Sequence, residues 1–260
     1  MNVENYKDEI IEAYSKREST QSISERYNCS QQTIARFLKR NGVNVTKKRS
    51  RKNINSNYFN NIDSGIKAYF LGFIAADGSI FKDKNNKTVF SLCIQSSDRS
   101  ILEKLSIELS NSNILIGKER IRSNGSSTTD IRFSDEEFTN SLLHLGICFN
   151  KTFDLEWVTV PDEFMRDFVR GYFDGDGSVY ISKNKVYGNF VGNKKFLPKL
   201  RDYLFDLEIL PVKYAIIDRG NFCSFHFGSI ASNKALYEYM YYDGCFCLER
   251  KKVKFEFCPS

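Results

Sequence analysis

The chain has 260 residues, of which 41% are hydrophobic and 27% charged, a balance that excludes a disordered polar chain and leaves enough length to bury a core. No apolar run reaches the roughly 18 residues that a membrane span needs, and the N-terminus resembles neither a signal nor a transit peptide, so we expect the protein to stay where it is made, in the simplest case the cytoplasm. The formal net charge is +6.

The excess positive charge lies in one part of the chain. Residues 1–60 hold 12 Lys and Arg against 6 Asp and Glu, while the remaining residues hold 26 of each sign. A basic segment beside a neutral body suggests a polyanionic partner, most simply nucleic-acid phosphates. A solubilising tail is the alternative that charge alone leaves open.

Three short helices are predicted at the N-terminus. Apolar side chains recur at helical spacing in residues 5–16, 20–27 and 31–40. Ser30 can cap the third helix and Gly42 can end it. Two short helices joined by a tight turn resemble a helix-turn-helix, in which the start of the last helix enters the major groove. The side chains that this resemblance places at base edges are Gln31, Gln32, Thr33 and Arg36. A purely structural three-helix cap is the alternative.

A basic segment, TKKRSRKN at 46–53, follows with five positive charges and no acidic residue. Charge repulsion extends such a segment, which could lie along phosphates or in a minor groove; an ordinary solvated linker is the alternative. The predicted contacts here are Lys47, Lys48, Arg49 and Arg51. We therefore expect a DNA-binding domain at 1–46 and a linker at 47–62.

The rest of the chain contains an internal repeat. AYFLGFIAADGSI at 68–80 corresponds to FVRGYFDGDGSVYI at 168–181, and their Asp77 and Asp176 are 99 residues apart. Downstream, each copy continues with two strands, a helix, a hairpin with Gly at its turn, and another helix. This order predicts an α+β fold with two subdomains, at 63–158 and 159–260.

Small residues recur every four positions in both apolar helices. They are Ala68, Gly72 and Ala76 in the first copy, and Gly171 and Gly175 in the second. Such a spacing puts them on one helix face. Because glycine inside a helix costs roughly 1 kcal/mol relative to alanine, we expect these faces to serve a close helix–helix contact.

The two nine-residue motifs, FLGFIAADG at 70–78 and VRGYFDGDG at 169–177, resemble the LAGLIDADG pattern position by position. The resemblance extends from about residue 58 to the C-terminus. It implies a monomeric homing endonuclease in which two pseudo-symmetric αββαββα subdomains form a saddle-shaped sheet over double-stranded DNA. It also implies a long asymmetric target and a staggered double-strand break with short 3′ overhangs.

In this reading Asp77 and Asp176 are catalytic. Phosphodiester hydrolysis needs charge neutralisation and an activated water, which hard cations such as Mg²⁺ supply, and two neighbouring carboxylates repel each other unless a cation lies between them. An Asp-Gly after one helix is ordinarily a turn, but two matching copies argue against that. We expect two or three Mg²⁺ ions, replaceable by Mn²⁺. The predicted metal ligands come from Asp77, Asp176, Ala76, Gly78, Gly175 and Gly177.

A third acid, Asp174, corresponds to Ala75 in the first copy and is therefore expected to be structural. By the resemblance, each copy also supplies a basic residue near the scissile phosphate. Lys151 lies 74 residues after its aspartate and Lys251 lies 75 after its own, which favours Lys251 over Lys252. A lysine there could polarise water or stabilise developing charge.

Basic residues on or beside the predicted strands are the expected DNA contacts. Because alternate strand positions share a face, not all of them can touch DNA, and phosphate contacts should outnumber base contacts. They are Lys82, Lys84, Lys87, Arg120, Arg122, Arg132, Lys183, Lys185, Lys213 and Arg219.

A non-cleaving nucleic-acid binder, either a transcription regulator or an intron maturase, remains as an alternative, although regulators on this scaffold tend to lose the acidic pair that this chain keeps. An intein is less supported, since Met1 stands where a splicing Cys or Ser would. Seven cysteines without a CxxC pair are expected to be reduced, buried thiols rather than a zinc site.

Overall fold

A computed structural model describes residues 3–15, 18, 20–43, 45, 54–112 and 115–256. The chain divides into two compact units, residues 1–51 and residues 52–260. The predicted contacts Lys47, Lys48, Arg49 and Arg51 lie outside the described residues.

The first unit is a small helical head. Its elements are η1 (Val3–Tyr6), α1 (Lys7–Ser15), α2 (Thr20–Arg26) and α3 (Gln31–Arg40). The helices close around a core that includes the fully buried Ile10, Ile23 and Ile34. The Ser30 side chain accepts a hydrogen bond from the Thr33 N–H at 3.1 Å and so caps α3. The predicted helices are therefore present, while their identity as a DNA-reading helix-turn-helix stays a prediction.

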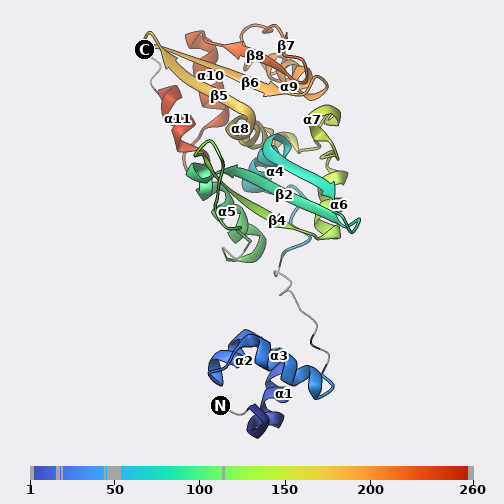
Figure 1. Ribbon diagram of the computed structural model, residues 1–260. Coiled ribbons are helices and arrows are strands. Elements are labelled where there is room, and N and C mark those ends of the chain that lie inside the picture. Colours follow the sequence, from blue (N-terminus) through green and yellow to red (C-terminus); the bar gives the residue numbers. More distant parts are fainter. Residues whose placement is uncertain are drawn as a thin grey trace. The chain divides into compact units, whose positions relative to one another are not determined.

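The second unit is built from two copies of one αββαββα pattern, as predicted (Figure 1). The first copy consists of α4 (Gly65–Asp77), β1 (Gly78–Lys82), β2 (Thr88–Gln95), η2 (Ser96–Asp98), α5 (Arg99–Ser110), β3 (Arg120–Ile121), β4 (Ser127–Phe133), α6 (Glu136–His144) and α7 (Lys151–Asp154). The second consists of η3 (Asp162–Phe164), α8 (Met165–Asp176), β5 (Gly177–Ser182), β6 (Lys185–Gly192), α9 (Phe196–Asp206), β7 (Ile217–Asp218), β8 (Cys223–Phe227), α10 (Ile230–Met240) and α11 (Glu249–Glu256).

Each copy forms a four-stranded antiparallel sheet. The strand orders are β1-β2-β4-β3 and β5-β6-β8-β7, so the two sheets repeat the same topology. Each motif helix runs directly into the first strand: α4 ends at Asp77 and β1 begins at Gly78, while α8 ends at Asp176 and β5 begins at Gly177. Both aspartates therefore lie at the carboxyl end of a helix and at the start of a sheet.

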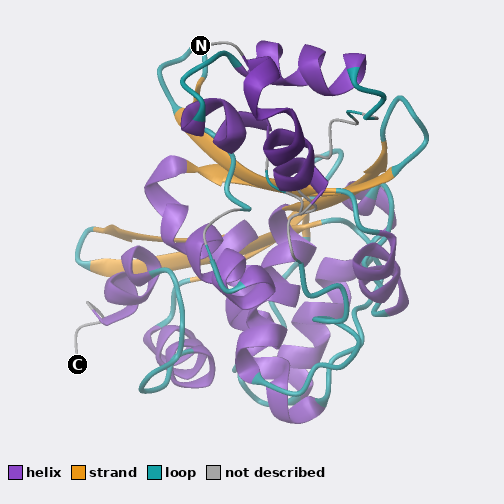
Figure 2. Cartoon of the chain, turned by 90° about the horizontal axis from the view of Figure 1, so that it is seen from below, coloured by secondary structure: helices purple, strands orange, loops and turns teal. Residues whose placement is uncertain are grey.

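The helices of this unit cover one face of each sheet (Figure 2). α5 and α6 pack on the first sheet, and α9 and α10 on the second, while α4 and α8 lie side by side between the sheets (Figure 1). One continuous hydrophobic core runs through both copies. The opposite faces of the sheets carry exposed side chains at alternate positions, such as Ser178 and Tyr180 on β5. Among the helices described, none is long and apolar enough to cross a membrane.

Candidate active site

Two glycines allow the motif helices to touch through their backbones. A Cβ added to Gly171 would lie 1.9 Å from the carbonyl oxygen of Tyr69, and one added to Gly72 would lie 2.0 Å from that of Phe168. Both distances are far below van der Waals contact, so only glycine fits at these two places. The predicted small-residue faces are thus placed at the crossing of α4 and α8, with Ala68 fully buried on the same helix as Gly72.

The same contact continues to the carboxyl ends of the two helices. A Cβ on Gly175 would lie 2.3 Å from the Cβ of Ala76 and 3.2 Å from Oδ2 of Asp77. The Asp77 carboxylate therefore lies against the last turn of α8, one residue before Asp176. The helix crossing brings the two repeated aspartates to one place.

The two carboxylates are electrostatically coupled. Asp77 reaches solvent and Asp176 is half-buried, yet the protein atoms around both helix ends displace much of their hydration. This desolvation, followed by repulsion from Asp176, raises the pKa of Asp77 to about 6. Desolvation also raises the pKa of Asp176, against the opposing charges of Lys151 and Lys251. Within the described chain, neither carboxylate accepts a side-chain hydrogen bond or forms an ion pair.

Lys151, from α7, is seated on the end of α4. Its Nζ donates to the carbonyl oxygens of Ala75, at 3.0 Å, and Ala76. Carbonyls in the last turn of a helix lack intrahelical partners, so an ammonium group is a suitable cap. Burial lowers the pKa of Lys151, while Asp176 and Asp77 oppose that shift.

Lys251, from α11, occupies the corresponding place on α8. Its Nζ donates to the carbonyl oxygens of Phe173, Asp174 and Gly177 at 2.8, 2.7 and 2.6 Å. These bonds use all three N–H groups, whereas within the described part of the chain Lys151 donates to two carbonyls. Lys251 is 4% exposed, and burial lowers its pKa to about 8. Of the two candidate lysines, Lys251 is the one on the helix end; Lys252 is half-buried.

These residues fit a divalent cation bound chiefly by the two carboxylates. Two neighbouring carboxylates with raised pKa values, and no side-chain hydrogen-bond donor among the described residues, present the hard oxygen ligands that Mg²⁺ takes. Among the described residues, no group of three or more His, Cys, Asp or Glu side chains comes together, so water or substrate phosphate would complete the coordination. The carbonyls of Ala76 and Gly177, predicted as ligands, already accept from lysines. Ligation by Gly78 and Gly175 stays a prediction.

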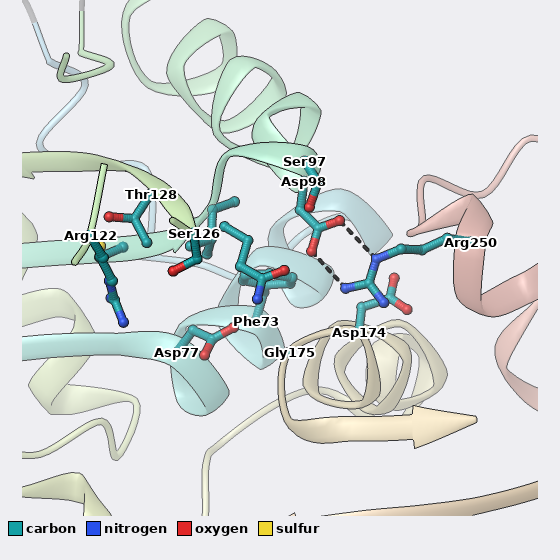
Figure 3. Close-up of a pocket in the computed structure, with 13 residues that line it drawn as sticks. Phe73, Asp77, Ser97, Asp98, Arg122, Ser126, Thr128, Asp174, Gly175 and Arg250 are labelled. Carbon is teal, nitrogen blue, oxygen red and sulfur yellow. Dashed lines mark hydrogen bonds and ion pairs between the residues drawn. The ribbon is translucent and has the colours of Figure 1, made fainter. Parts of the chain in front are cut away.

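An open pocket of about 600 Å³ adjoins Asp77 between the two copies. Across it, Arg250 of α11 forms two hydrogen bonds with Asp98 of η2, at 2.8 and 2.6 Å (Figure 3). Arg122, a predicted DNA contact, also lines this pocket. Sequence reasoning missed the Asp98–Arg250 pair because the two residues are 152 positions apart and carry no local motif.

All ten basic residues predicted as DNA contacts on or beside the strands are exposed, but they do not all lie on the open faces of the two sheets. Lys84, Lys183, Arg122 and Arg219 lie in hairpin turns, and Lys82, Lys87 and Lys185 flank them at or beside strand ends. Arg120 pairs with Asp130 at 2.8 Å, and Arg132 lies over the Phe81 ring at 4.9 Å. Lys213 pairs with Asp202 of α9 and lies over Phe205, so it is tied to the helix-covered side.

The open face of the second sheet carries residues that the search for cations missed. Tyr180 and Tyr187 are register partners whose rings stack at 5.7 Å, and Ser178 donates to Asn189 at 2.9 Å. His226, on the neighbouring strand, is the register partner of Asn189. Counting every second residue from Ser178 along β5, rather than counting charges, would have found this uncharged surface.

In the head unit, the residues predicted to contact base edges lie at the start of α3. Gln31, Gln32, Thr33 and Arg36 are all exposed. Gln31 also donates to the Thr20 hydroxyl at 3.0 Å, and the hydroxyl groups of Thr33 and Ser30 lie 2.8 Å apart. Gln32 and Arg36, one helical turn apart, have no such hydrogen bond within the described residues.

A family comparison assigns the second unit. The model of the LAGLIDADG-like domain matches residues 64–146 and 163–239, which is most of both copies. The chain belongs to this LAGLIDADG-like family. Its two motif helices are thus α4 and α8, as the sequence resemblance implied.

Solved structures show the same LAGLIDADG fold. The meganuclease I-SmaMI bound to an uncleaveable DNA is 16% identical, with a TM-score of 0.50 over 75% of this chain and 90% of that chain. A single-residue variant of I-SmaMI is 14% identical, with a TM-score of 0.50 over 74% and 89%. Such low identities establish the fold alone.

One curated relative is similar in sequence. It is the DNA-directed RNA polymerase subunit Rpo1C of Methanocaldococcus jannaschii, 28% identical over 119 residues, or 45% of this chain. The matched region spans 13% of the length of that protein.

Proposed function

We propose that this protein is a site-specific DNA endonuclease that makes a staggered double-strand break in a long, asymmetric target. The observation that carries the proposal is the meeting of Asp77 and Asp176 at the ends of two helices in backbone contact, each end capped by a lysine. An aspartate that only forms a turn needs neither a partner carboxylate nor a buried ammonium group. Each copy has both an aspartate and a capping lysine, as cleavage at two scissile phosphates would require.

At each scissile phosphate, the aspartates and the lysines would have different roles. Asp77 and Asp176 would hold Mg²⁺, with Mn²⁺ as a substitute; when bound, the metal neutralises phosphate charge and activates water. Lys151 and Lys251 hold the helix ends in place, and their charges favour ionised aspartates. Among the residues that the structure describes, Lys151 donates to two carbonyls, which leaves its third N–H group to donate to substrate, whereas Lys251 acts through its charge and its cap.

The two copies are related in fold but differ in the side chains they expose. The first open face has Arg132 over Phe81, while the second has the Tyr180–Tyr187 stack with Asn189. Unequal faces within one chain fit two different half-sites, and a monomer is sufficient to bind both. We further propose that the head unit, through Gln32 and Arg36, contacts DNA beyond the saddle.

The test is cleavage of a plasmid library that carries randomised duplex targets, incubated with the full chain and Mg²⁺. We expect the wild-type protein to yield a cleavable target, and Asp77→Asn and Asp176→Asn each to abolish double-strand cleavage while binding to that target persists. A variant that cuts both strands normally would contradict the assignment.

The alternative is a nucleic-acid binder that does not cleave. It would be favoured if the wild-type protein binds duplex or intron RNA tightly, yet leaves every library target intact in Mg²⁺ and in Mn²⁺. Because the acidic pair is intact in this chain, we place cleavage first.

A further inference from the structure

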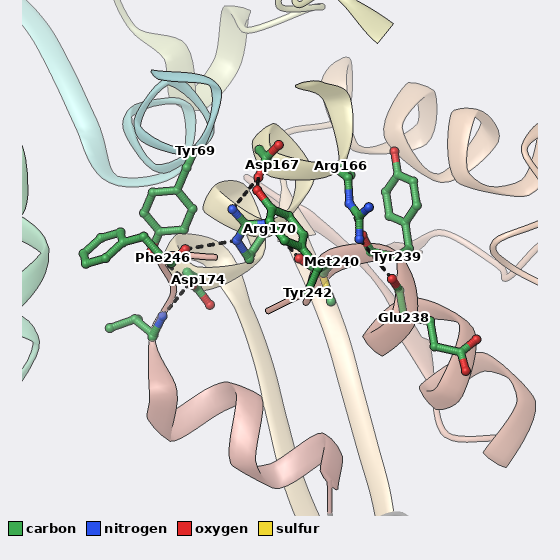
Figure 4. A network of polar contacts seen from close by, with 11 residues as sticks. Tyr69, Arg166, Asp167, Arg170, Asp174, Glu238, Tyr239, Met240, Tyr242 and Phe246 are labelled. Carbon is green, nitrogen blue, oxygen red and sulfur yellow. Dashed lines mark hydrogen bonds and ion pairs between the residues drawn. The ribbon is translucent and has the colours of Figure 1, made fainter. Parts of the chain in front are cut away.

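A buried polar network links the second motif helix to the segment that precedes α11 (Figure 4). Arg170, 1% exposed, donates from Nη1 to the Met240 carbonyl at 2.7 Å and from Nε to the Phe246 carbonyl at 3.0 Å. Its remaining nitrogen donates to Asp167, which also accepts from the Tyr242 hydroxyl at 2.8 Å. The segment 241–248 is therefore tied to α8 at several points.

Asp174 completes this network at the start of α11. Its Oδ2 accepts from the Leu248 N–H at 2.7 Å and from the Tyr69 hydroxyl of α4 at 2.9 Å. Its carboxylate is 2% exposed, and Oδ1 has no partner among the described residues. One buried oxygen thus joins the other motif helix, its own motif helix and the residue just before α11.

The first turn of α11 connects this oxygen to the site. Lys251 donates its main-chain N–H to the Leu248 carbonyl at 2.9 Å, and its Nζ reaches back to the main-chain carbonyl of Asp174 at 2.7 Å. Leu248 is therefore fixed on one side by the Asp174 side chain and on the other by Lys251. A shift of Leu248 would move the ammonium group away from the end of α8.

The charged members of this network occur in the second copy and have no counterparts in the first. With the 99-residue offset of the repeat, Asp167, Arg170 and Asp174 correspond to Ala68, Leu71 and Ala75. Lys151 is instead supported by Asn193, whose Nδ2 donates to the carbonyls of Lys151 and Leu155 at 2.8 and 2.9 Å. The two lysines are thus positioned by different means.

We propose that Asp174 is a positioning residue that, through Leu248 and Tyr69, holds Lys251 on the helix end that carries Asp176. This inference rests on the endonuclease function proposed above and adds that Asp174 serves one of the two half-sites. A carboxylate with a purely structural role would support both half-sites equally.

The experiment measures cleavage of each strand separately, on an end-labelled duplex recovered with the wild-type full chain. Lys251→Met first identifies the strand that depends on Lys251. We expect Asp174→Ala to slow cleavage of that same strand about tenfold or more relative to the other, because loss of a hydrogen-bond partner that orients the groups around a metal site typically costs 10–100-fold. Asp174→Asn should restore most of the rate, because its amide oxygen can accept both hydrogen bonds and its nitrogen would occupy the place of the unpartnered Oδ1.

Asn233→Ala is the matched control. Asn233 is also buried in the second copy, with one unpartnered oxygen in the described chain, but its side chain donates to the Val186 carbonyl at 2.9 Å and has no hydrogen bond to the described residues of α11. It should slow both strands alike or neither. If Asp174→Ala does not fold, Tyr69→Phe removes one bond to the same oxygen and should slow the same strand about threefold or more.

Equal loss on both strands in Asp174→Ala, or in Tyr69→Phe where that variant replaces it, would overturn the proposal, as would the absence of any strand preference in Lys251→Met. A wild-type protein that cuts no target would instead contradict the endonuclease function itself, so the two failures are distinguishable.

Discussion

Gly171 lies directly against the carbonyl oxygen of Tyr69, so close that an added Cβ would be 1.9 Å from it. The two residues belong to different motif helices, and the atoms that meet belong to the main chains of both. The position of Asp77 relative to Asp176 therefore depends on a backbone contact, which is harder to adjust than an interface of flexible side chains.

Replacing Gly171 with Ala should weaken this contact. Because the methyl group cannot be accommodated without separating the helices, we expect the free energy of unfolding to fall by about 1–3 kcal/mol or more, although Ala is the better helix former. Urea denaturation followed by circular dichroism measures it. An unchanged or raised midpoint would show that the helices are further apart than the structure places them.

The ion pair between Asp98 and Arg250 should couple the two copies energetically. The Asp98 side chain is 11% exposed and that of Arg250 is 51% exposed, so solvent screens the pair only in part. A double-mutant cycle with Asp98→Asn and Arg250→Met should give a coupling free energy of about 1–2 kcal/mol in urea unfolding.

The exposed pair Arg99–Glu103 is the control for that cycle, because it has a similar bond length, 2.9 Å, on one helix. Its cycle should give roughly 0.3–0.5 kcal/mol. A coupling between Asp98 and Arg250 no larger than this would mean that the pair joins the copies no more strongly than an ordinary exposed ion pair does.

Regular repetition made most of the fold predictable. The matching Asp-Gly motifs and the small residues at every fourth position identified α4 and α8, their contact and the two aspartates, because helical spacing and backbone approach are local properties of sequence. Asp98 and Arg250 were not predictable, because thirteen helices and strands of the described chain separate them and their pairing exists only once both sheets have formed. The correspondence with Ala75 sets Asp174 apart from the repeated pair, but its partners Leu248 and Tyr69 come from distant segments.

The raised pKa of Asp77, about 6, predicts a pH-dependent response to Mg²⁺. A folded-state pKa above the unfolded value of about 3.9 means that the metal-free protein loses stability as pH rises from about 4 to 6 and does not regain it above that range. Mg²⁺ binds only the ionised carboxylates and should offset this loss. Millimolar Mg²⁺ should therefore raise Tm more at about pH 7.5 than at about pH 5.

Asp77→Asn is the appropriate comparison for this measurement. Asp174 also has a pKa of about 6 and contributes to the metal-free pH profile, so only the part of Tm that depends on Mg²⁺ is informative. In Asp77→Asn that part should become small at both pH values. A full Mg²⁺ effect in the variant would place the cation elsewhere.

The open faces of the two sheets show a different limit of sequence-based prediction. Charge alone selected ten basic residues, of which four lie in hairpin turns, three flank those turns, and Lys213 lies on the helix-covered side. Side-chain alternation, not charge, decides which residues share the open face. Tyr180 and Tyr187 face outward because their strand neighbours Val179 and Val186 are buried.

The two open faces should differ in how their DNA contacts respond to salt. Arg132 is exposed on the first sheet, and a cation that contacts phosphate releases counterions on binding. Removing it by Arg132→Ala should therefore weaken binding and reduce the slope of log K against log salt by about one. Tyr187→Ala removes an uncharged stacked ring from the second face, so it should weaken binding through lost contact area and leave the slope as it is.

Fluorescence anisotropy with a labelled target duplex across a series of salt concentrations, in Ca²⁺ to prevent cleavage, measures both the affinity and the slope. Equal slopes in the two variants would mean that Arg132 does not contact phosphate, whereas a reduced slope in Tyr187→Ala would mean that the tyrosine stack supports a cation on the neighbouring hairpin rather than the DNA itself.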